Sequence, residues 1–205
     1  MNISFLLKGI IIGFSIAAPV GPIGVLCIQR TLTQGRLSGL VSGLGAATAD
    51  TIYGCIGGFG LMFISNILIS QQIWFRLFGG AFLCYLGIKT FLARPAEQAA
   101  SAKGNGLIGT YASTFFLTLI NPMTILYFAG IFAGLGIASA SGNYVTAGAL
   151  VLGVFMGSAL WWLILSSSVS IFRGKLNPHG LQWINRISSL IILGFGLYAF
   201  LCLIR

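Results

Sequence analysis

Six long apolar runs constrain the fold of this chain more than any other feature. Of its 205 residues, 57% are hydrophobic and only 6% are charged, whereas soluble domains average about 25% charged residues. A membrane-spanning helix needs about 20 apolar residues, and every run reaches that length. The sequence therefore predicts an all-α integral membrane protein with six transmembrane helices, at approximately 3–29, 38–69, 72–92, 107–135, 144–172 and 182–204.

Lysine and arginine lie mainly in alternate connections between the runs. Eight of them follow the first, third and fifth runs, and three lie on the opposite side. Because cytoplasmic loops are enriched in basic residues, the odd-numbered loops are expected in the cytoplasm and both termini outside. The formal charge of +9 comes from these scattered positions. No basic face with interleaved aromatic residues exists, so no nucleic-acid partner is expected.

A polar stretch at about 94–106 divides the chain near its middle. Three apolar runs precede it, within about 1–93, and three follow it, within about 107–205. An odd number of spans per half requires the two halves to enter the membrane in opposite senses. The sequence thus predicts two inverted three-helix repeats within one transporter domain, 1–205.

Short matching motifs support this division into repeats. Pro22 in the first run corresponds to Pro122 in the fourth, and both follow a sequence that interrupts the apolar run. In the next span of each half, Asp50 aligns with Ser158. If the repeats are real, one half carries a titratable group where the other carries a neutral hydroxyl.

The first and fourth spans are predicted to break at their prolines. Pro19, Gly21 and Pro22 interrupt the first span, and Asn121 and Pro122 interrupt the fourth. Proline lacks a backbone donor and clashes with the preceding turn, so the helix should unwind there. The half-helix that follows then presents free N–H groups and a positive dipole end, which suits a carboxylate. The alternative is that both prolines only kink the helices and shape the bundle.

Asp50 is the residue whose placement demands an explanation. The chain has two acidic residues, and the other, Glu97, lies in the polar loop. A carboxylate near the bilayer centre costs roughly 3 kcal/mol, so acidic residues there usually have a function. Asp50 is predicted to exchange a proton or to bind the ammonium group of a solute. The alternative is a structural ion pair with Arg30 or Arg36.

Catalytic and cofactor-binding patterns are missing from the sequence. His179 is the only histidine, so no Ser/His/Asp triad can form around Asp50. No phosphate-binding glycine motif is present, which argues against ATP hydrolysis. The cysteines lie in apolar runs without Cys-x-x-Cys spacing, so no disulfide framework, metal site or other cofactor is expected. They are Cys27, Cys55, Cys84 and Cys202.

The motifs and their order resemble those of the LysE/RhtB family of amino-acid exporters. They are the break Ala18-Pro19-Val20-Gly21-Pro22, the glycine-rich block 43–50 that ends at Asp50, and Asn121-Pro122. The resemblance covers essentially the whole chain. It implies an exporter of amino acids or similar small solutes in the bacterial inner membrane, driven by proton exchange. The binding residues that it implies are Pro19, Gly21, Pro22, Asp50, Asn121 and Pro122, with Asp50 also coupling transport to protons.

One departure from the family leaves the solute open. The first break continues as Ile23-Gly24-Val25, where many members have a polar pair, and this weakens an assignment to basic amino acids. The interpretation is a secondary exporter that works by alternating access and contacts solute, protons and membrane lipid. A metal-cation exporter with Cys27 or Cys55 as a ligand and a non-transporting scaffold subunit are the alternatives.

Glycine pairs four residues apart predict close contacts between helices. Most are expected to serve packing within the bundle, although glycine-rich faces also permit a homodimer. The motifs are Gly39-x-x-x-Gly43, Gly130-x-x-x-Gly134 and Gly153-x-x-x-Gly157.

Overall fold

The structure is a computed structural model that describes residues 3–19, 21–59, 67, 70–92, 106–134, 144–173 and 178–204. The predicted polar loop with Glu97 lies outside these residues. The described chain is helical and contains no strand, so the all-α class is confirmed for it. Its helices are α1 (Ile3–Ala17), α2 (Pro22–Gln34), α3 (Arg36–Gly58), α5 (Gln72–Leu92), α7 (Gly106–Leu119), α8 (Pro122–Gly134), α9 (Tyr144–Arg173) and α10 (Pro178–Ile204).

Up to five membrane spans are supported by helix length and apolar composition within the described residues. Three are single helices, Ile73–Leu92, Tyr144–Arg173 and His179–Cys202. Two more arise if the bent pairs α1–α2 and α7–α8 each count as one span. The 23-residue α3 is long enough to cross, but its many small and polar residues lower its hydropathy. The sixth span and the inverted-repeat arrangement therefore remain predictions.

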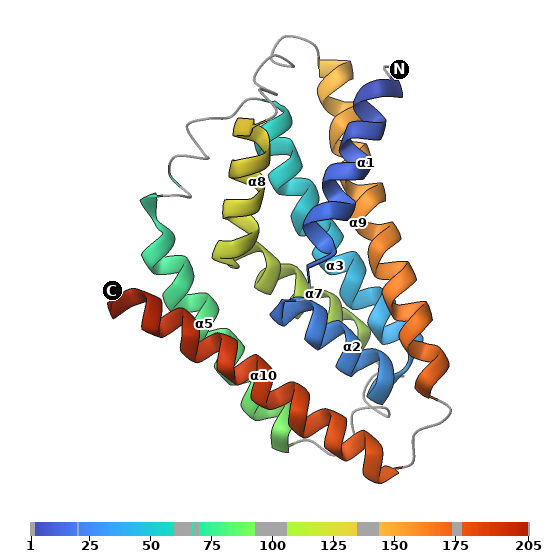
Figure 1. Ribbon diagram of the computed structural model, residues 1–205, viewed down its shortest axis with the longest axis vertical. Coiled ribbons are helices and arrows are strands. Elements are labelled where there is room, and N and C mark those ends of the chain that lie inside the picture. The colour runs from blue at the N-terminus through green and yellow to red at the C-terminus, as the bar shows by residue number, and fades with distance from the viewer. Residues whose placement is uncertain are drawn as a thin grey trace.

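The two halves of the chain exchange equivalent contacts (Figure 1). Helix α1 packs along α9, and α7 packs along α3. In the same way, α2 contacts α9 and α8 contacts α3. Helices α5 and α10 lie against each other at one side of the molecule. There α10 also contacts α2, and α5 contacts α8. These contacts between the halves come in matching pairs, whereas α2 packs on α3 within the first half more closely than α8 packs on α9 within the second.

Glycines bring α1 and α9 into backbone contact. A Cβ atom built on Gly157 would lie 2.0 Å from the carbonyl oxygen of Ile10, and one on Gly9 would lie 2.2 Å from that of Leu150. The packing role predicted for Gly157 is therefore confirmed. A Cβ on Gly130, in contrast, would meet no described atom within 4 Å, so that motif does not mediate a contact at this position.

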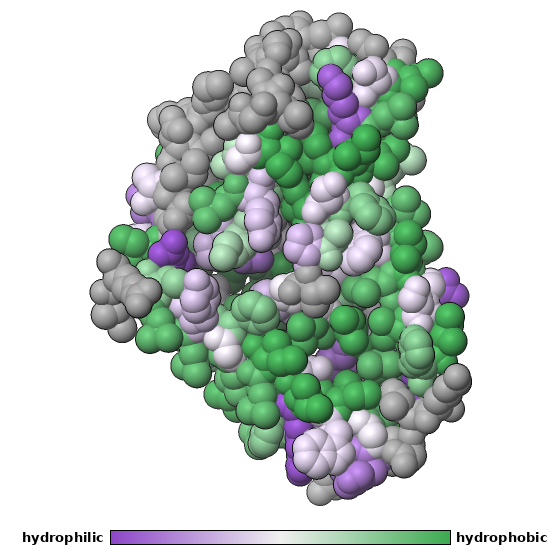
Figure 2. Space-filling view, viewed as in Figure 1, coloured by the Kyte–Doolittle hydropathy of each residue, from purple (hydrophilic) through white to green (hydrophobic). Residues whose placement is uncertain are grey.

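Helix α2 lies inside the molecule and packs against α3, α7, α9 and α10. Each of the other described helices exposes large hydrophobic side chains, whereas α2 exposes none. The face in Figure 2 is accordingly rich in hydrophobic residues, and it is hollowed at mid-height, between α8 and the α5–α10 pair. Nine of the 13 residues of α2 are buried, including the polar residues Gln29, Arg30, Thr31 and Thr33. An apolar exterior around a polar interior is typical of a protein that encloses a polar site within lipid.

Candidate functional site

The first helix break lies between Ala17, where α1 ends, and Pro22, where α2 begins. The axes of the two helices differ by 80°. Gly21 occupies the N-cap position with extended backbone (φ −105°, ψ −166°), and its carbonyl accepts a hydrogen bond of 3.0 Å from the Val25 N–H. Because glycine has no side chain, nothing at this position caps the first turn of α2.

The second break separates α7 from α8, and the side chain of Asn121 caps the start of α8. The two axes differ by 58°. The Asn121 Oδ1 atom accepts a hydrogen bond of 3.2 Å from the Met123 N–H, and its Nδ2 donates one of 3.0 Å to Thr124 Oγ1. Asn121 thus acts as a cap, which satisfies one of the free donors at the start of α8. The two breaks match in place but differ in chemistry.

Asp50 lies on α3, faces the interior and is 3% exposed. Its Oδ2 atom accepts a hydrogen bond of 2.7 Å from the Ser158 hydroxyl on α9. The two residues that align between the halves therefore touch each other. Ala46, one turn before Asp50 on α3, lines the same cavity as the carboxylate, and its small side chain leaves room beside it.

Arg30 is buried as well, but it binds other partners. The Arg30–Asp50 ion pair that the sequence allowed is wrong, because the guanidinium donates all its described hydrogen bonds elsewhere. These bonds tie α2 to α3 and α7. Their acceptors are Ser42 Oγ (3.0 Å), Thr110 O (3.0 Å), Thr114 Oγ1 (2.7 Å) and Ser113 Oγ (2.8 Å). Arg36, the other suggested partner, is exposed at the start of α3.

One cavity of about 320 Å³ joins both breaks to Asp50. Side chains from α1, α2, α3, α5, α7, α8, α9 and α10 reach it. All the residues that the sequence marked as a binding site line this space, although Pro19 and Pro122 are 103 positions apart. They are Pro19, Gly21, Pro22, Asp50, Asn121 and Pro122.

Two further residues of this cavity were missed by sequence reasoning. Arg76 on α5 brings a positive charge to the cavity wall, and its Nη1 donates a hydrogen bond of 2.8 Å to the Cys202 carbonyl. Trp162 on α9 is 4% exposed and also lines the cavity. In the sequence, Arg76 was interpreted only as a charge that sets the membrane orientation, and Trp162 only as an interfacial or core aromatic residue. The spacing of Trp162 four positions after Ser158 was the available signal, because it places both on one face of α9.

The cysteines contribute no metal site to the described structure. Cys27 is buried and donates its thiol to the Gly39 carbonyl at 3.3 Å. Cys55 is half-buried on α3. The described residues contain no group of three or more histidine, cysteine, aspartate or glutamate side chains that could hold a metal ion. Nothing in this part of the chain therefore favours the metal-exporter alternative.

Comparison with known proteins decides the family. The model of the LysE type translocator family matches residues 14–202, which include both breaks and Asp50. The chain belongs to the LysE family of translocators. This protein of the LysE family is therefore a multi-pass membrane transporter and not an enzyme.

Named relatives show what members of this family are described as doing. The chain is 32% identical to the "Putative amino acid efflux protein YcgF" of Bacillus subtilis (strain 168), over 97% of this chain and 95% of that protein. It is 22% identical to the threonine efflux protein of Escherichia coli (strain K12), over 87% of this chain and 88% of that protein. No solved structure matches the chain.

Proposed function

We propose that this translocator is a secondary active exporter of amino acids or similar small solutes, coupled to protons and working by alternating access. The observation that carries the proposal is the cavity at which Asp50 meets both helix breaks. Pockets that hold small molecules start at about 300 Å³, so a cavity of about 320 Å³ suits a solute of amino-acid size. The names of two relatives, given for amino acid and threonine efflux, support the same solute class.

The polar groups around the cavity suit a zwitterion. Asp50 can accept hydrogen bonds from an ammonium group, and the helix start at Pro22 and the guanidinium of Arg76 favour a carboxylate. The rest of the lining is mostly aliphatic or aromatic, and includes Leu83, Leu117 and others. Burial of the charged ends in such a site is favourable only if each finds a partner of opposite sign.

Asp50 is the proposed coupling residue because its hydrogen bond crosses between the two halves. Ser158 donates to it from α9, whereas Asp50 itself belongs to α3. A movement of one half against the other would change this bond and the access of Asp50 to either side. In the proposed cycle a proton and the ammonium group of the solute compete for the Asp50 carboxylate, so loading of one releases the other.

Flux measurements in proteoliposomes test the proposal. Purified protein is reconstituted, loaded with a mixture of the proteinogenic L-amino acids and given a pH gradient, and the released amino acids are identified by mass spectrometry. Wild type should release a subset of them faster when the gradient is present. Asp50→Asn should abolish the response to the gradient, while Glu97→Gln, which removes the other acidic side chain of the chain, should retain it.

Two outcomes would contradict the proposal. Full proton-coupled flux in Asp50→Asn would remove Asp50 from the mechanism. Wild-type vesicles that release no amino acid would exclude the proposed solute class and leave the scaffold alternative in place.

Location, orientation and assembly complete the proposal. The exporter resides in the bacterial inner membrane, in contact with lipid, with both termini outside and with a homodimer as its assembled form. Tags at the two termini should be cleaved by protease added to intact spheroplasts, and protection of both tags would reverse the orientation. Mass photometry of the purified protein in lipid nanodiscs should give twice the chain mass, and a single chain mass would exclude the dimer.

A further inference from the structure

The start of α2 is an uncapped helix end that faces the cavity. Gly21 offers no side chain, and Pro22 has no N–H. The next two backbone N–H groups belong to Ile23 and Gly24, both buried and both part of the cavity lining, and neither donates to a described atom. The matching end of α8 differs, because Asn121 accepts from Met123 there. The first turn of α2 therefore presents two such donors to the cavity, whereas at the start of α8 only the Thr124 N–H is left without a described acceptor.

Trp162 adds an independent unused donor at the same place. Its side chain is 4% exposed, and its Nε1–H has no hydrogen-bond partner among the described residues. A buried polar group without a partner costs about as much as a lost hydrogen bond, so it usually has one in a functional state. Trp162 is one of the residues that line the cavity, and its indole nitrogen is buried beside it.

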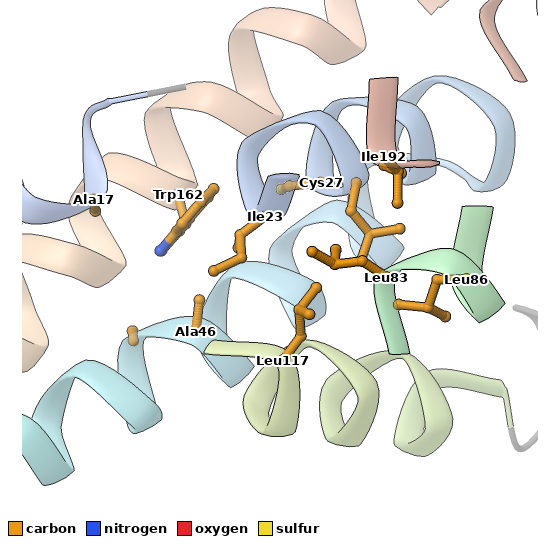
Figure 3. Packing of buried hydrophobic residues seen from close by; sticks show 11 residues of the cluster. Ala17, Ile23, Cys27, Ala46, Leu83, Leu86, Leu117, Trp162 and Ile192 are labelled. Carbon is orange, nitrogen blue, oxygen red and sulfur yellow. The ribbon is translucent and has the colours of Figure 1, made fainter. Parts of the chain in front are cut away.

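The Trp162 ring and the start of α2 belong to one cluster of buried residues. Figure 3 places the ring among Ala17, Ile23 and Ala46, with the ring nitrogen at the end on the side of Ala17 and Ala46. Ala17 ends α1 and Ile23 lies in the first turn of α2, so the Trp162 side chain packs beside the break. All these residues line the cavity.

The first-turn N–H groups of α2 and the Trp162 indole N–H are hydrogen-bond donors without described acceptors. Backbone N–H groups at a helix start carry a partial positive charge, and an indole N–H can only donate. Such a group of donors binds an oxyanion, and the carboxylate is the oxyanion that an amino acid carries. Asp50 at the same cavity can bind the ammonium group of that solute.

We propose that the Trp162 indole N–H and the first-turn N–H groups of α2 form the carboxylate subsite of the transporter, and that the capped start of α8 does not. This inference rests on the proposed function, and it names the group of the solute that the site recognises. Trp162 is thus a solute-binding residue that selects for a free carboxylate.

Trp162→Phe tests the inference with the smallest possible change, because it keeps an aromatic ring and removes the N–H. Flux is measured in proteoliposomes for the amino acid that wild type releases fastest and for its carboxamide. A hydrogen bond to a charged group corresponds to about a 10- to 100-fold change in affinity. Trp162→Phe should therefore raise KM for the amino acid by about 10-fold or more. The preference for the amino acid over the carboxamide should fall by a similar factor.

Trp161→Phe is the matched control. This neighbouring ring packs edge-on against Phe14, with ring centroids 5.2 Å apart, and does not line the cavity. Its KM and its preference for the carboxylate should stay within about twofold of wild type, since Trp161 does not line the cavity and phenylalanine keeps an aromatic ring there. Equal losses for the amino acid and its carboxamide in Trp162→Phe would show a packing role and overturn the inference.

A second variant tests the subsite without touching Trp162. Gly21→Asp places a carboxylate at the N-cap of α2, where a Cβ meets no atom within 4 Å. The new side chain should cap the helix and raise its thermal stability, while competing with the solute carboxylate and raising KM. A Gly21→Asp protein that is more stable and keeps the wild-type KM would overturn the inference.

The two levels of proposal fail in different ways. Wild-type vesicles that move no amino acid would overturn the proposed function and the subsite with it. Amino-acid flux by wild type, together with unchanged kinetics in Trp162→Phe, would overturn the subsite alone.

Discussion

Replacing Gly157 by alanine should weaken the contact between α1 and α9. The added Cβ would lie 2.0 Å from the Ile10 carbonyl oxygen, whereas ordinary contacts start at 3.4 Å, so the helices must separate locally by about 1.4 Å. The atoms in the way belong to the backbone, and no side-chain rotation can make room. Overpacking of this kind costs about 1–3 kcal/mol.

Gly148→Ala on the same helix is the control, because a Cβ there meets no atom within 4 Å. Alanine in place of a helical glycine gains up to about 1 kcal/mol at both positions, so this gain cancels in the comparison. Thermal unfolding of the two variants in one detergent, followed by tryptophan fluorescence, measures the difference. At about 2–4 °C per kcal/mol for a chain of this size, Gly157→Ala should melt about 2–12 °C below Gly148→Ala. Equal melting temperatures would refute the direct backbone contact.

Three further predictions concern polar side chains. Ser158→Ala removes a hydroxyl that donates to a buried carboxylate, and it should lower the free energy of unfolding by about 1–3 kcal/mol in a denaturant titration. Ser167→Ala is the control, because the Ser167 hydroxyl has no described partner, and its free energy of unfolding should stay within about 0.5 kcal/mol of wild type. Arg30→Gln removes the hydrogen bonds that join α2 to α3 and α7, and it should lower the free energy of unfolding by about 1–3 kcal/mol. Arg36 is exposed, so Arg36→Gln should leave the free energy of unfolding unchanged. A similar decrease in both variants would contradict the assigned role of Arg30. Cys27→Ala should leave amino-acid flux and the cadmium tolerance of expressing cells unchanged, and a loss of cadmium tolerance would revive the metal-exporter alternative.

Local features of the fold were predictable because proline and apolar content act locally. Proline fits the first position of a helix, where its missing N–H is not needed, and both α2 and α8 start at the prolines that the sequence singled out. Apolar runs likewise predicted α5, α9 and α10 at nearly their observed bounds. The second predicted span is less well supported, because α3 is rich in small residues that allow close packing but lower its hydropathy.

Side-chain partners were not predictable, because they depend on which helices meet. Arg30 binds Ser113 and Thr114, more than 80 positions away, although an acid in the same half was the obvious partner in the sequence. The difference between the two breaks was visible in the sequence, since asparagine precedes one proline and glycine the other. The effect of this difference could be seen only in the structure, where the Asn121 side chain accepts a hydrogen bond from the first turn of α8. The unused indole N–H of Trp162 has no sequence signal at all.

The contact between α1 and α9 has a consequence for biogenesis. The first helix of the chain meets its main partner only about 140 residues later, since Gly9 lies against Leu150 and Gly153. At roughly 5–20 residues per second, the ribosome needs on the order of 10–30 s to make that partner. Throughout this interval the glycine face of α1 must be shielded by the insertion machinery or by lipid. The N-terminal half can therefore enter the membrane early, but it acquires its final packing only when α9 arrives.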